Sequence, residues 1–202
     1  FKAVEFCLEH GLDYNIYRPS IVYGDSRTGK SLRFNALYFP VKTLAYLRKL
    51  FYKDIIENGG EKAREMGIYL NENNDLYLPI RILSKEKGRI NIIPIEYFVN
   101  AVTSIIFSGI KNKIFHIVNQ QGKDLAILAN YVENFFHLKG LEIVHAKDIN
   151  KPQRNPLESL FDNYISVYGD YMHDERFFDD TNTQSVLEPL NIFCPDFTYR
   201  VF

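Results

Sequence analysis

Cysteine is scarce in this chain of 202 residues, and its scarcity excludes two kinds of site. The only two cysteines, Cys7 and Cys194, lie near opposite ends of the sequence, without the spacing of metal ligands. Structural zinc sites use several closely spaced Cys or His ligands, and small disulfide-stapled domains carry several cysteine pairs. We therefore expect free thiols, a reducing compartment, and neither a metal site nor a disulfide framework.

A surplus of charge is also missing. The 24 Lys and Arg residues are balanced by 25 Asp and Glu residues, so the formal net charge is −1. A nearly neutral protein has no overall field that would draw it to nucleic acid or to an anionic membrane. We expect small-molecule or protein partners and no nucleic acid.

The sequence has no long apolar run either. A helix that spans a bilayer needs roughly 18 to 20 consecutive apolar residues, and a signal peptide needs a charged and then apolar N-terminus. Neither pattern is present, so we expect no transmembrane segment and a cytoplasmic location. The chain starts at Phe1, without Met, and already reads there as the middle of a helix, which predicts a piece of a longer protein.

What the sequence does contain is the pattern of an α/β protein, with a hydrophobic fraction of 46% that suffices for a core. Residues 1–10 predict a helix that Gly11 ends. The β-rich stretch from Tyr14 to Tyr23 predicts a strand, which Gly24 and Asp25 break. A helix, a tight turn and a buried strand form the unit from which parallel α/β sheets are built.

Further elements follow from apolar spacing along the chain. It predicts helices at 32–58, 95–110 and 124–138, strands at 76–83, 90–95, 114–118 and 141–145, and short helices over the last fifty or so residues. We expect Pro40 to kink or restart the first helix and Pro79 to place its strand at a sheet edge. Asp124 is an expected N-cap, while Gly109 and Gly140 are the expected ends of two helices.

The most specific motif is the stretch from Gly24 to Ser31, which satisfies the phosphate-loop formula Gly, four residues, Gly, Lys, Ser. In such a loop the backbone amides cradle phosphates and the Ser binds magnesium. Two observations argue against it: no clear second strand ends in an acid for magnesium, and Pro19 removes a donor from the preceding strand. A phosphate-loop NTPase, which would lose nucleotide binding on Lys30→Ala, remains an alternative.

A longer match starts earlier. Residues 17–30, Tyr-Arg-Pro-Ser-Ile-Val-Tyr-Gly-Asp-Ser-Arg-Thr-Gly-Lys, resemble the segment that extended short-chain dehydrogenases carry after their catalytic helix. The Asp-Ser-x-Thr-Gly part is similar to the acyl-thioester reductase branch, which includes fatty acyl-CoA reductases of the male-sterility type and the reductase domains of peptide synthetases. Residues 91–99, 115–119 and 178–182 resemble later family stretches in the same order, with Glu96 in place of the usual Asp.

The resemblance implies an α/β fold, the C-terminal part of an extended Rossmann-like reductase, with its last parallel strands and a mainly helical substrate-binding lobe. Residues 1–30 would end the dinucleotide-binding domain. Residues 31–202 would form the substrate lobe, with return strands of the sheet near 90–120. The implied activity is the NADP- or NAD-dependent reduction of acyl thioesters, bound to CoA or to a carrier, to aldehyde or alcohol.

The family's catalytic groups are a Tyr and a Lys four residues apart, and its cofactor lies on a glycine-rich turn. The sequence has no such Tyr and Lys in a suitable place and no Gly-x-Gly-x-x-Gly. We therefore assign no catalytic residue, expect this chain alone to be inactive, and expect NADP or NAD to be bound mainly by an N-terminal half outside it.

What remains of a site is one strand end and one loop. The resemblance implies that four residues pass the nicotinamide end of the cofactor: Pro19, Ser20, Ile21 and Val22. It also implies that three loop residues meet the substrate or its phosphopantetheine arm: Tyr23, Arg27 and Lys30. The simpler interpretations are a buried strand for the first group and a solvated loop for the second.

Two further alternatives stay open. Arg89, which precedes the strand at 90–95, resembles an Arg that sugar-nucleotide epimerases and dehydratases of the same superfamily place near the nucleotide diphosphate. The second alternative is that the chain is a non-catalytic module that binds a partner or ligand without turnover. Because a fragment that lacks most of its parallel sheet exposes apolar edges, we also expect self-association.

Overall fold

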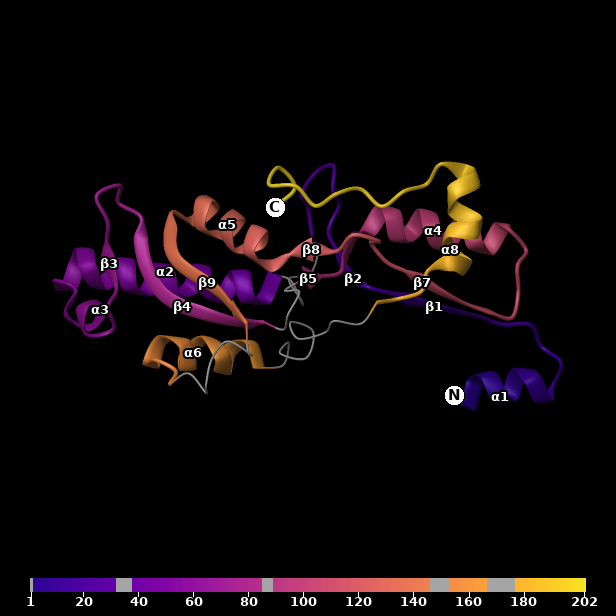
Figure 1. Ribbon diagram of the computed structural model, residues 1–202, viewed down its shortest axis with the longest axis horizontal. Helices are drawn as coiled ribbons and strands as arrows, with labels where there is room; N and C mark the ends of the chain where they lie inside the picture. The colour runs from indigo at the N-terminus through magenta and orange to yellow at the C-terminus, as the bar shows by residue number, and fades with distance from the viewer. Residues whose placement is uncertain (1, 32–37, 85–88, 146–152, 167–176) are drawn as a thin grey trace. The chain divides into compact units, whose positions relative to one another are not determined.

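The computed structural model of this chain describes residues 2–31, 38–84, 89–145, 153–166 and 177–202 (Figure 1). The chain divides into two compact units, which are described separately. Unit 1 comprises Phe1–Leu32, Asn91–Gly122 and Arg176–Phe202, and unit 2 comprises Arg33–Ile90 and Lys123–Glu175. None of the helices in the described ranges is long and apolar enough to cross a membrane.

Unit 1 contains two pairs of parallel strands and their helices. Its elements are α1 (Lys2–Glu9), β1 (Asn15–Pro19), β2 (Ile21–Tyr23), β6 (Ile92–Pro94), α4 (Ile95–Phe107), β7 (Lys113–Ile117), α8 (Thr181–Leu187) and the 3-10 turn η2 (Glu188–Leu190). Strand β1 pairs with β7 and β2 pairs with β6, both in parallel. The first predicted helix and strand are confirmed, with Gly11 at φ +63° after the helix and a break at Ser20 in the strand.

The register of β1 and β7 is fixed at both ends by hydrogen bonds outside the ladder. Before the strands, the Tyr14 amide donates to Asn112 Oδ1 at 3.1 Å, and the Asn112 amide donates to the Tyr14 carbonyl at 2.5 Å. After them, the Ser20 amide donates to the Ile117 carbonyl at 3.0 Å. A slip of one residue would break these bonds and turn every side chain to the other face, so the strand ends are held at one level.

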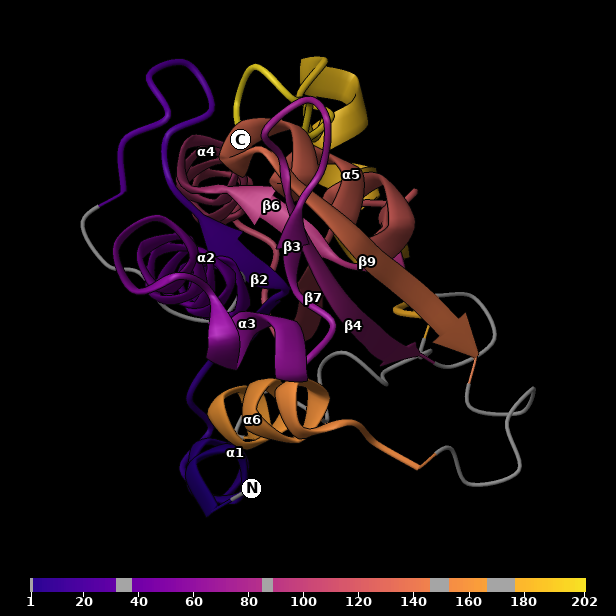
Figure 2. The ribbon, with the colours of Figure 1, turned by 90° about the vertical axis from the view of Figure 1, so that its left-hand side faces the viewer.

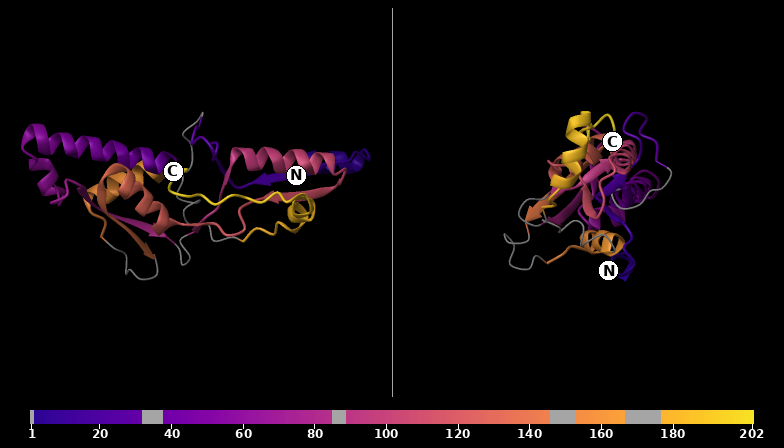
Figure 3. Two further views of the ribbon diagram at one scale, coloured as in Figure 1. Left: turned by 90° about the horizontal axis from the view of Figure 1, so that it is seen from above. Right: turned by 90° about the vertical axis from the view of Figure 1, so that its right-hand side faces the viewer.

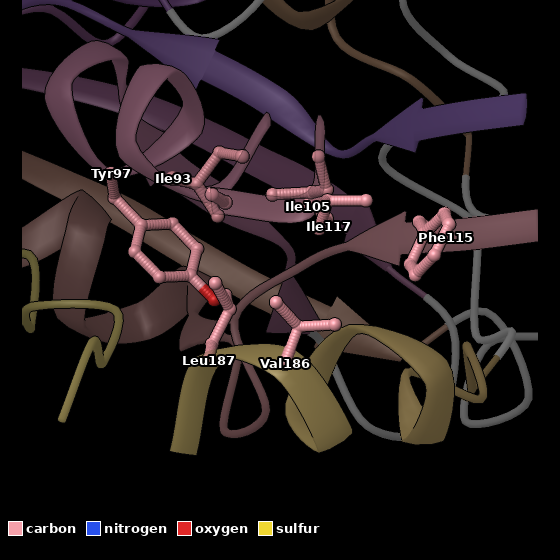
Figure 4. Packing of buried hydrophobic residues seen from close by; sticks show 8 residues of the cluster. Ile93, Tyr97, Ile105, Phe115, Ile117, Val186 and Leu187 are labelled. Atoms are coloured by element: carbon pink, nitrogen blue, oxygen red, sulfur yellow. The ribbon is translucent and has the colours of Figure 1, made fainter. Parts of the chain in front are cut away.

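The core of unit 1 is built from β6, α4, β7 and α8. It consists of Ile93, Tyr97, Ala101, Ile105, Phe115, Ile117, Val186 and Leu187. Figure 4 shows the Tyr97 ring pointing toward the helix that carries Val186 and Leu187. The helix predicted at 95–110 is thus confirmed, and its inward face brings α8 against the strands.

Side chains from the start of α8 cover carbonyls of β7. Asn182 Nδ2 donates to the Ile114 carbonyl at 2.9 Å, and Thr183 Oγ1 donates to the His116 carbonyl at 2.8 Å. These bonds satisfy backbone groups that a neighbouring strand would otherwise pair. The 178–182 stretch, noted in the sequence for its family resemblance, therefore has a structural use at the sheet edge.

Unit 2 is a three-stranded sheet with helices packed on it. Its elements are α2 (Tyr38–Asn58), α3 (Glu61–Glu65), β3 (Tyr69–Leu70), β4 (Leu76–Ser84), β5 (Arg89–Ile90), β8 (Lys123–Asp124), α5 (Leu125–Phe136), β9 (Leu138–His145) and α6 (Pro156–Ile165). The strand order is β3-β4-β9, with β9 parallel to β4 (Figure 2), and β5 pairs antiparallel with β8. Helices α2 and α6 contact β4, and α5 contacts β9.

The prediction that Pro79 marks an edge strand is wrong, since β4 is the middle strand of the three. Strand β3 pairs only with Leu76 and Tyr77, however, and the ladder to β9 shifts register between Tyr77 and Ile80. The proline lies within this irregularity, where its missing N–H removes no ladder bond.

The prediction that Gly140 ends helix α5 is also wrong. His137 ends the helix in the left-handed conformation at φ 51°, and Gly140 lies inside β9 at φ +96°. A Cβ on Gly140 would come within 2.6 Å of the Leu78 carbonyl oxygen, so glycine permits the close approach of β9 to the irregular part of β4. At the other end of α5 the Asp124 N-cap is confirmed, because its carboxylate accepts from the Ala126 amide at 2.8 Å.

Helix α2 is one continuous helix, as Figure 3 shows, and Pro40 lies in its first turn. A proline there removes no helical hydrogen bond, because the first N–H groups of a helix have no intrahelical acceptor. Residues 32–37 of the predicted helix lie outside the described residues.

The beginning of α6 covers the backbone of β4 in the way that α8 covers β7. Asn155 Nδ2 donates to the Pro79 carbonyl, the Arg81 amide donates to Glu158 Oε1, and Arg154 Nη1 donates to the Arg81 carbonyl, each at 2.9 Å. Asn155 and Glu158 also form the capping box of α6. One set of side chains therefore starts the helix and covers the strand.

Glu158 is fully buried, with 0% of its side chain exposed, and is paired with Arg81 Nε at 2.6 Å. Burial by itself raises the pKa of a carboxyl group. Hydrogen bonds from Arg81 and Asn155, together with the charge of Arg154, outweigh burial and lower the pKa of Glu158 to about 2 from 4.5.

We predict that Glu158→Gln lowers the free energy of unfolding by about 2 kcal/mol at neutral pH, because it leaves two arginines without the buried negative charge that they pair with. Since the folded pKa is depressed, the contribution of Glu158 is present above pH 4.5 and is lost as the pH falls toward about 2. Urea unfolding across this range should show the difference between wild type and variant shrinking with acidity. The exposed Glu61→Gln is the control, and a pH-independent difference would contradict the assignment.

Candidate functional site

In each pair of parallel strands in unit 1, the two strands end at the same level. Strand β1 ends at Pro19 beside Ile117 of β7, and β2 ends at Tyr23 beside Pro94 of β6. In α/β sheets, ligands bind outside the carboxyl ends of parallel strands, where backbone groups have no further ladder partner. We call residues 19–22 the strand-end segment. Pro19 is exposed and the other three residues are half-buried.

Ser20 is the polar residue of this segment. Its backbone amide donates to the Ile117 carbonyl. Its hydroxyl oxygen, by contrast, is buried and has no hydrogen-bond partner among the described residues. A buried hydroxyl left unsatisfied costs about 1 to 3 kcal/mol, so such groups are rare without a use. A polar group of a ligand at the strand ends would satisfy it.

The loop after β2 closes on itself. The Asp25 amide donates to the Lys30 carbonyl at 2.9 Å, and the Gly29 amide donates to the Asp25 carbonyl at 2.8 Å. A Cβ on Gly24 would lie only 2.3 Å from the Lys30 carbonyl oxygen, so no other residue fits without moving the backbone. The glycine of the motif is therefore required by the loop's own closure.

The carboxylate of Asp25 occupies the inside of this loop. It accepts from the amides of Arg27 at 2.8 Å and Thr28 at 3.2 Å, and it pairs with Arg27 Nη2 at 2.9 Å. The Arg27 side chain and amide hold the pKa of Asp25 down, at about 2, so the carboxylate stays charged at neutral pH.

A second carboxylate holds the loop from outside. Glu96, in the first turn of α4, accepts from the Ser26 amide at 3.1 Å and from the Ser26 hydroxyl. The Ile95 amide also donates to the Gly24 carbonyl at 3.4 Å. The end of β2 is thus tied to the end of β6, although the two lie about 70 positions apart in the chain.

These contacts contradict the phosphate-loop hypothesis. The amides of residues 25–29 all donate to oxygens of the protein itself, and two carboxylates occupy the places that phosphate oxygens would need. Over the described ranges no group of three or more His, Cys, Asp or Glu side chains is arranged to hold a metal ion. The formula match is therefore coincidental, because amides that already have acceptors within the protein cannot cradle a nucleotide.

The three predicted substrate residues lie in different surroundings. Tyr23 is 4% exposed and its ring packs edge-on against Phe197, with centroids 4.8 Å apart. The Arg27 side chain is 75% exposed but paired with Asp25, and Lys30 is exposed. A contact with substrate stays a prediction for all three residues.

The C-terminal segment was not expected at the loop. Phe197 covers Tyr23, and Gly29 lies close to the Val201 carbonyl, which a Cβ would meet at 3.7 Å. Burial, and then the charge of Glu96, raise the pKa of the Cys194 thiol to about 12, so it is not a nucleophile at neutral pH. Local sequence carries no signal for these contacts.

The sequence contains one Tyr-x-x-x-Lys, formed by Tyr38 and Lys42. The pair lies in the first turns of α2 in unit 2, after the strand-end segment in the chain and not before it. Burial raises the pKa of Tyr97 in unit 1 to about 12, so its phenol stays protonated at neutral pH. That this chain holds no catalytic residue stays a prediction.

No protein-family model matches the sequence, and no significant match was found among curated proteins. Solved structures do match. The terminal R domain from the myxalamid PKS-NRPS biosynthetic pathway is similar with a TM-score of 0.59 and 16% identity, covering 99% of this chain and 44% of that one. A thiolation-reductase di-domain from an archaeal non-ribosomal peptide synthetase has a TM-score of 0.54 and 15% identity, covering 99% of this chain and 36% of that one.

The shared fold is α/β and Rossmann-like. The fold class predicted from the sequence is therefore confirmed. UDP-glucose 4-epimerase from Thermotoga maritima, at a TM-score of 0.47 and 16% identity, covers 99% of this chain and 47% of its own. The chain spans less than half the length of each of these three structures.

We predict that Gly24→Ala lowers the free energy of unfolding by about 2 kcal/mol, because its methyl group collides with the Lys30 carbonyl. Gly11→Ala is the comparison, since Gly11 has open space around it and only its left-handed φ of +63° opposes a side chain. It should cost about 1 kcal/mol. Urea denaturation measures both, and a Gly24→Ala protein as stable as wild type would show that the loop is not closed as described.

Proposed function

We propose that this chain is the substrate-side part of an NAD(P)H-dependent reductase that converts acyl thioesters, bound to CoA or to a carrier, to aldehyde or alcohol. The observation that carries the proposal is the unsatisfied Ser20 hydroxyl, which lies where the parallel pair β1 and β7 ends and the parallel pair β2 and β6 begins. It is supported by the fold shared with two reductase-containing structures of peptide-synthetase systems.

In this proposal the strand-end segment forms one wall of the nicotinamide site. The Ser20 hydroxyl suits the carboxamide or ribose, and Ile21 offers a half-buried apolar side chain to the ring. Val22, whose side chain packs against the core of unit 1, would contribute its backbone. The nicotinamide, when bound, supplies the hydride. The chain contributes positioning and no proton donor, so it would not catalyse the reduction by itself, and most of the cofactor would be held elsewhere.

The loop would serve the thioester side. Its backbone is closed by internal bonds, so Lys30 projects from a rigid support, and an exposed ammonium suits the phosphate of a phosphopantetheine arm. Arg27, whose guanidinium also balances Asp25, would add a second positive group. Tyr23, at the start of the loop, would hold it in place through its packing on Phe197.

The direct test is a ligand titration of the isotope-labelled chain followed by NMR. Nicotinamide mononucleotide should shift the amide signals of Ser20, Ile21 and Val22 in a saturable way with millimolar affinity, because only one wall of the site is present. S-octanoyl-4′-phosphopantetheine should shift Arg27 and Lys30. No saturable shift with either ligand up to about 10 mM would refute the proposal, and shifts with UDP-glucose in their place would favour an epimerase.

We predict that Ser20→Ala weakens nicotinamide mononucleotide binding about fivefold, the loss of one neutral hydrogen bond. It should not lower the free energy of unfolding, because the hydroxyl makes no bond within the described protein. Ser104→Ala, at another half-buried serine of unit 1, should change neither quantity. A loss of stability with unchanged binding would assign the Ser20 hydroxyl to the fold and not to a ligand.

A further inference from the structure

The strand-end segment is anchored on both sides, and one of the anchors is a single carboxylate. On the near side the Ser20 amide bonds to the Ile117 carbonyl at 3.0 Å. On the far side the chain leaves β2 and is held at Ser26 by Glu96. Strand β2 itself is only three residues long and pairs only with β6 among the described strands, so it needs both anchors to stay in place.

Glu96 carries most of the far anchor. Its carboxylate accepts from the Ser26 amide with both oxygens, at 3.1 and 3.3 Å, and from the hydroxyl of the same residue. The other bond between the loop and α4, from Ile95 to Gly24, is long at 3.4 Å. Hydrogen bonds to a charged acceptor are about twice as strong as neutral ones, and they weaken steeply with poor geometry.

The opposite strand fixes where Glu96 itself lies. Its helix starts directly after β6, which pairs with β2 through Ile92, Ile93 and Pro94. The helix is anchored below by Tyr97 and Ala101 in the core. A carboxylate in the first turn is also stabilised by the partial positive charge of the helix N-terminus. The position of the Glu96 carboxylate is therefore fixed by β6 and α4, and its hydrogen bonds hold Ser26 in place.

We propose that Glu96 is a positioning residue for the nicotinamide wall: through Ser26 it holds the strand-end segment and the following loop in the geometry that receives the cofactor. This inference rests on the proposed function. The carboxylate touches no reacting atom. Its role is to keep the backbone from Ser20 to Ser26 ordered before a ligand arrives, which lowers the ordering that binding would otherwise require.

The first arm of the test uses no ligand. Amide hydrogen exchange of the labelled chain should show the Ser26 amide exchanging at least about tenfold faster in Glu96→Ala than in wild type, since a charge-assisted bond is lost. Glu96→Gln, which keeps an acceptor but no charge, should be intermediate. Glu188→Gln, at an exposed acid of the same unit, should match wild type. An unchanged exchange rate of the Ser26 amide in Glu96→Ala would show that Glu96 does not hold the loop.

The second arm measures nicotinamide mononucleotide binding by the same variants. We expect Glu96→Ala to weaken this binding at least about tenfold, Glu96→Gln to fall between it and wild type, and Glu188→Gln to bind as wild type does. If Glu96→Ala does not fold, Ser26→Ala removes only the hydroxyl and should show the same effects at smaller size. Normal binding with a loosened loop would refute the positioning role.

The two arms separate the two claims. A wild-type chain that does not bind nicotinamide mononucleotide refutes the proposed function, and with it the positioning role, while the exchange of Ser26 still reports whether the anchor exists. A wild-type chain that binds the ligand, with variants that bind equally well, refutes the positioning role and leaves the proposed function intact.

Discussion

The parallel pairing of β1 with β7, locked in register at both ends, is the constraint on which the rest of unit 1 depends. Because the register is fixed, β1 stops beside the Ile117 carbonyl and the chain continues into β2 at a defined level. Strand β2 then meets β6, and the start of α4 brings Glu96 to the loop. The proposed site at the strand ends depends on these short strands keeping their register.

In this loop, carboxylate oxygens accept the amide hydrogen bonds that phosphate oxygens would accept in an NTPase. The carboxylates of Asp25 and Glu96 accept from the amides of residues 26–28, and backbone carbonyls accept from those of residues 25 and 29, so none of the five is left for a nucleotide. Side chains also satisfy backbone groups at two strands. The starts of α8 and α6 place Asn182 and Asn155 against carbonyls of β7 and β4, so side chains at a helix N-terminus satisfy strand carbonyls in both units.

The sequence predicts those features of the fold that local chemistry decides. Helix spacing, the Asp124 cap and the turn at Gly11 need only a few neighbouring residues, and they are confirmed where the structure describes the chain. Gly140 and the loop contacts needed distant information. Gly140 serves an approach to Leu78, and the loop closes on a carboxylate 70 positions away, so no local pattern distinguishes them from a helix end or a phosphate cradle. The roles of the strand-end residues stay predictions.

The central claim is that the strand-end segment faces a nicotinamide. Intermolecular nuclear Overhauser effects between nicotinamide mononucleotide and the methyl-labelled chain test it most directly. The account predicts contacts from the ring protons to the methyl groups of Ile21, because the Val22 methyl groups pack against the core on the other face of β2. Ring contacts confined to other methyl groups, or a phosphate located on the amides of residues 25–29, would contradict it.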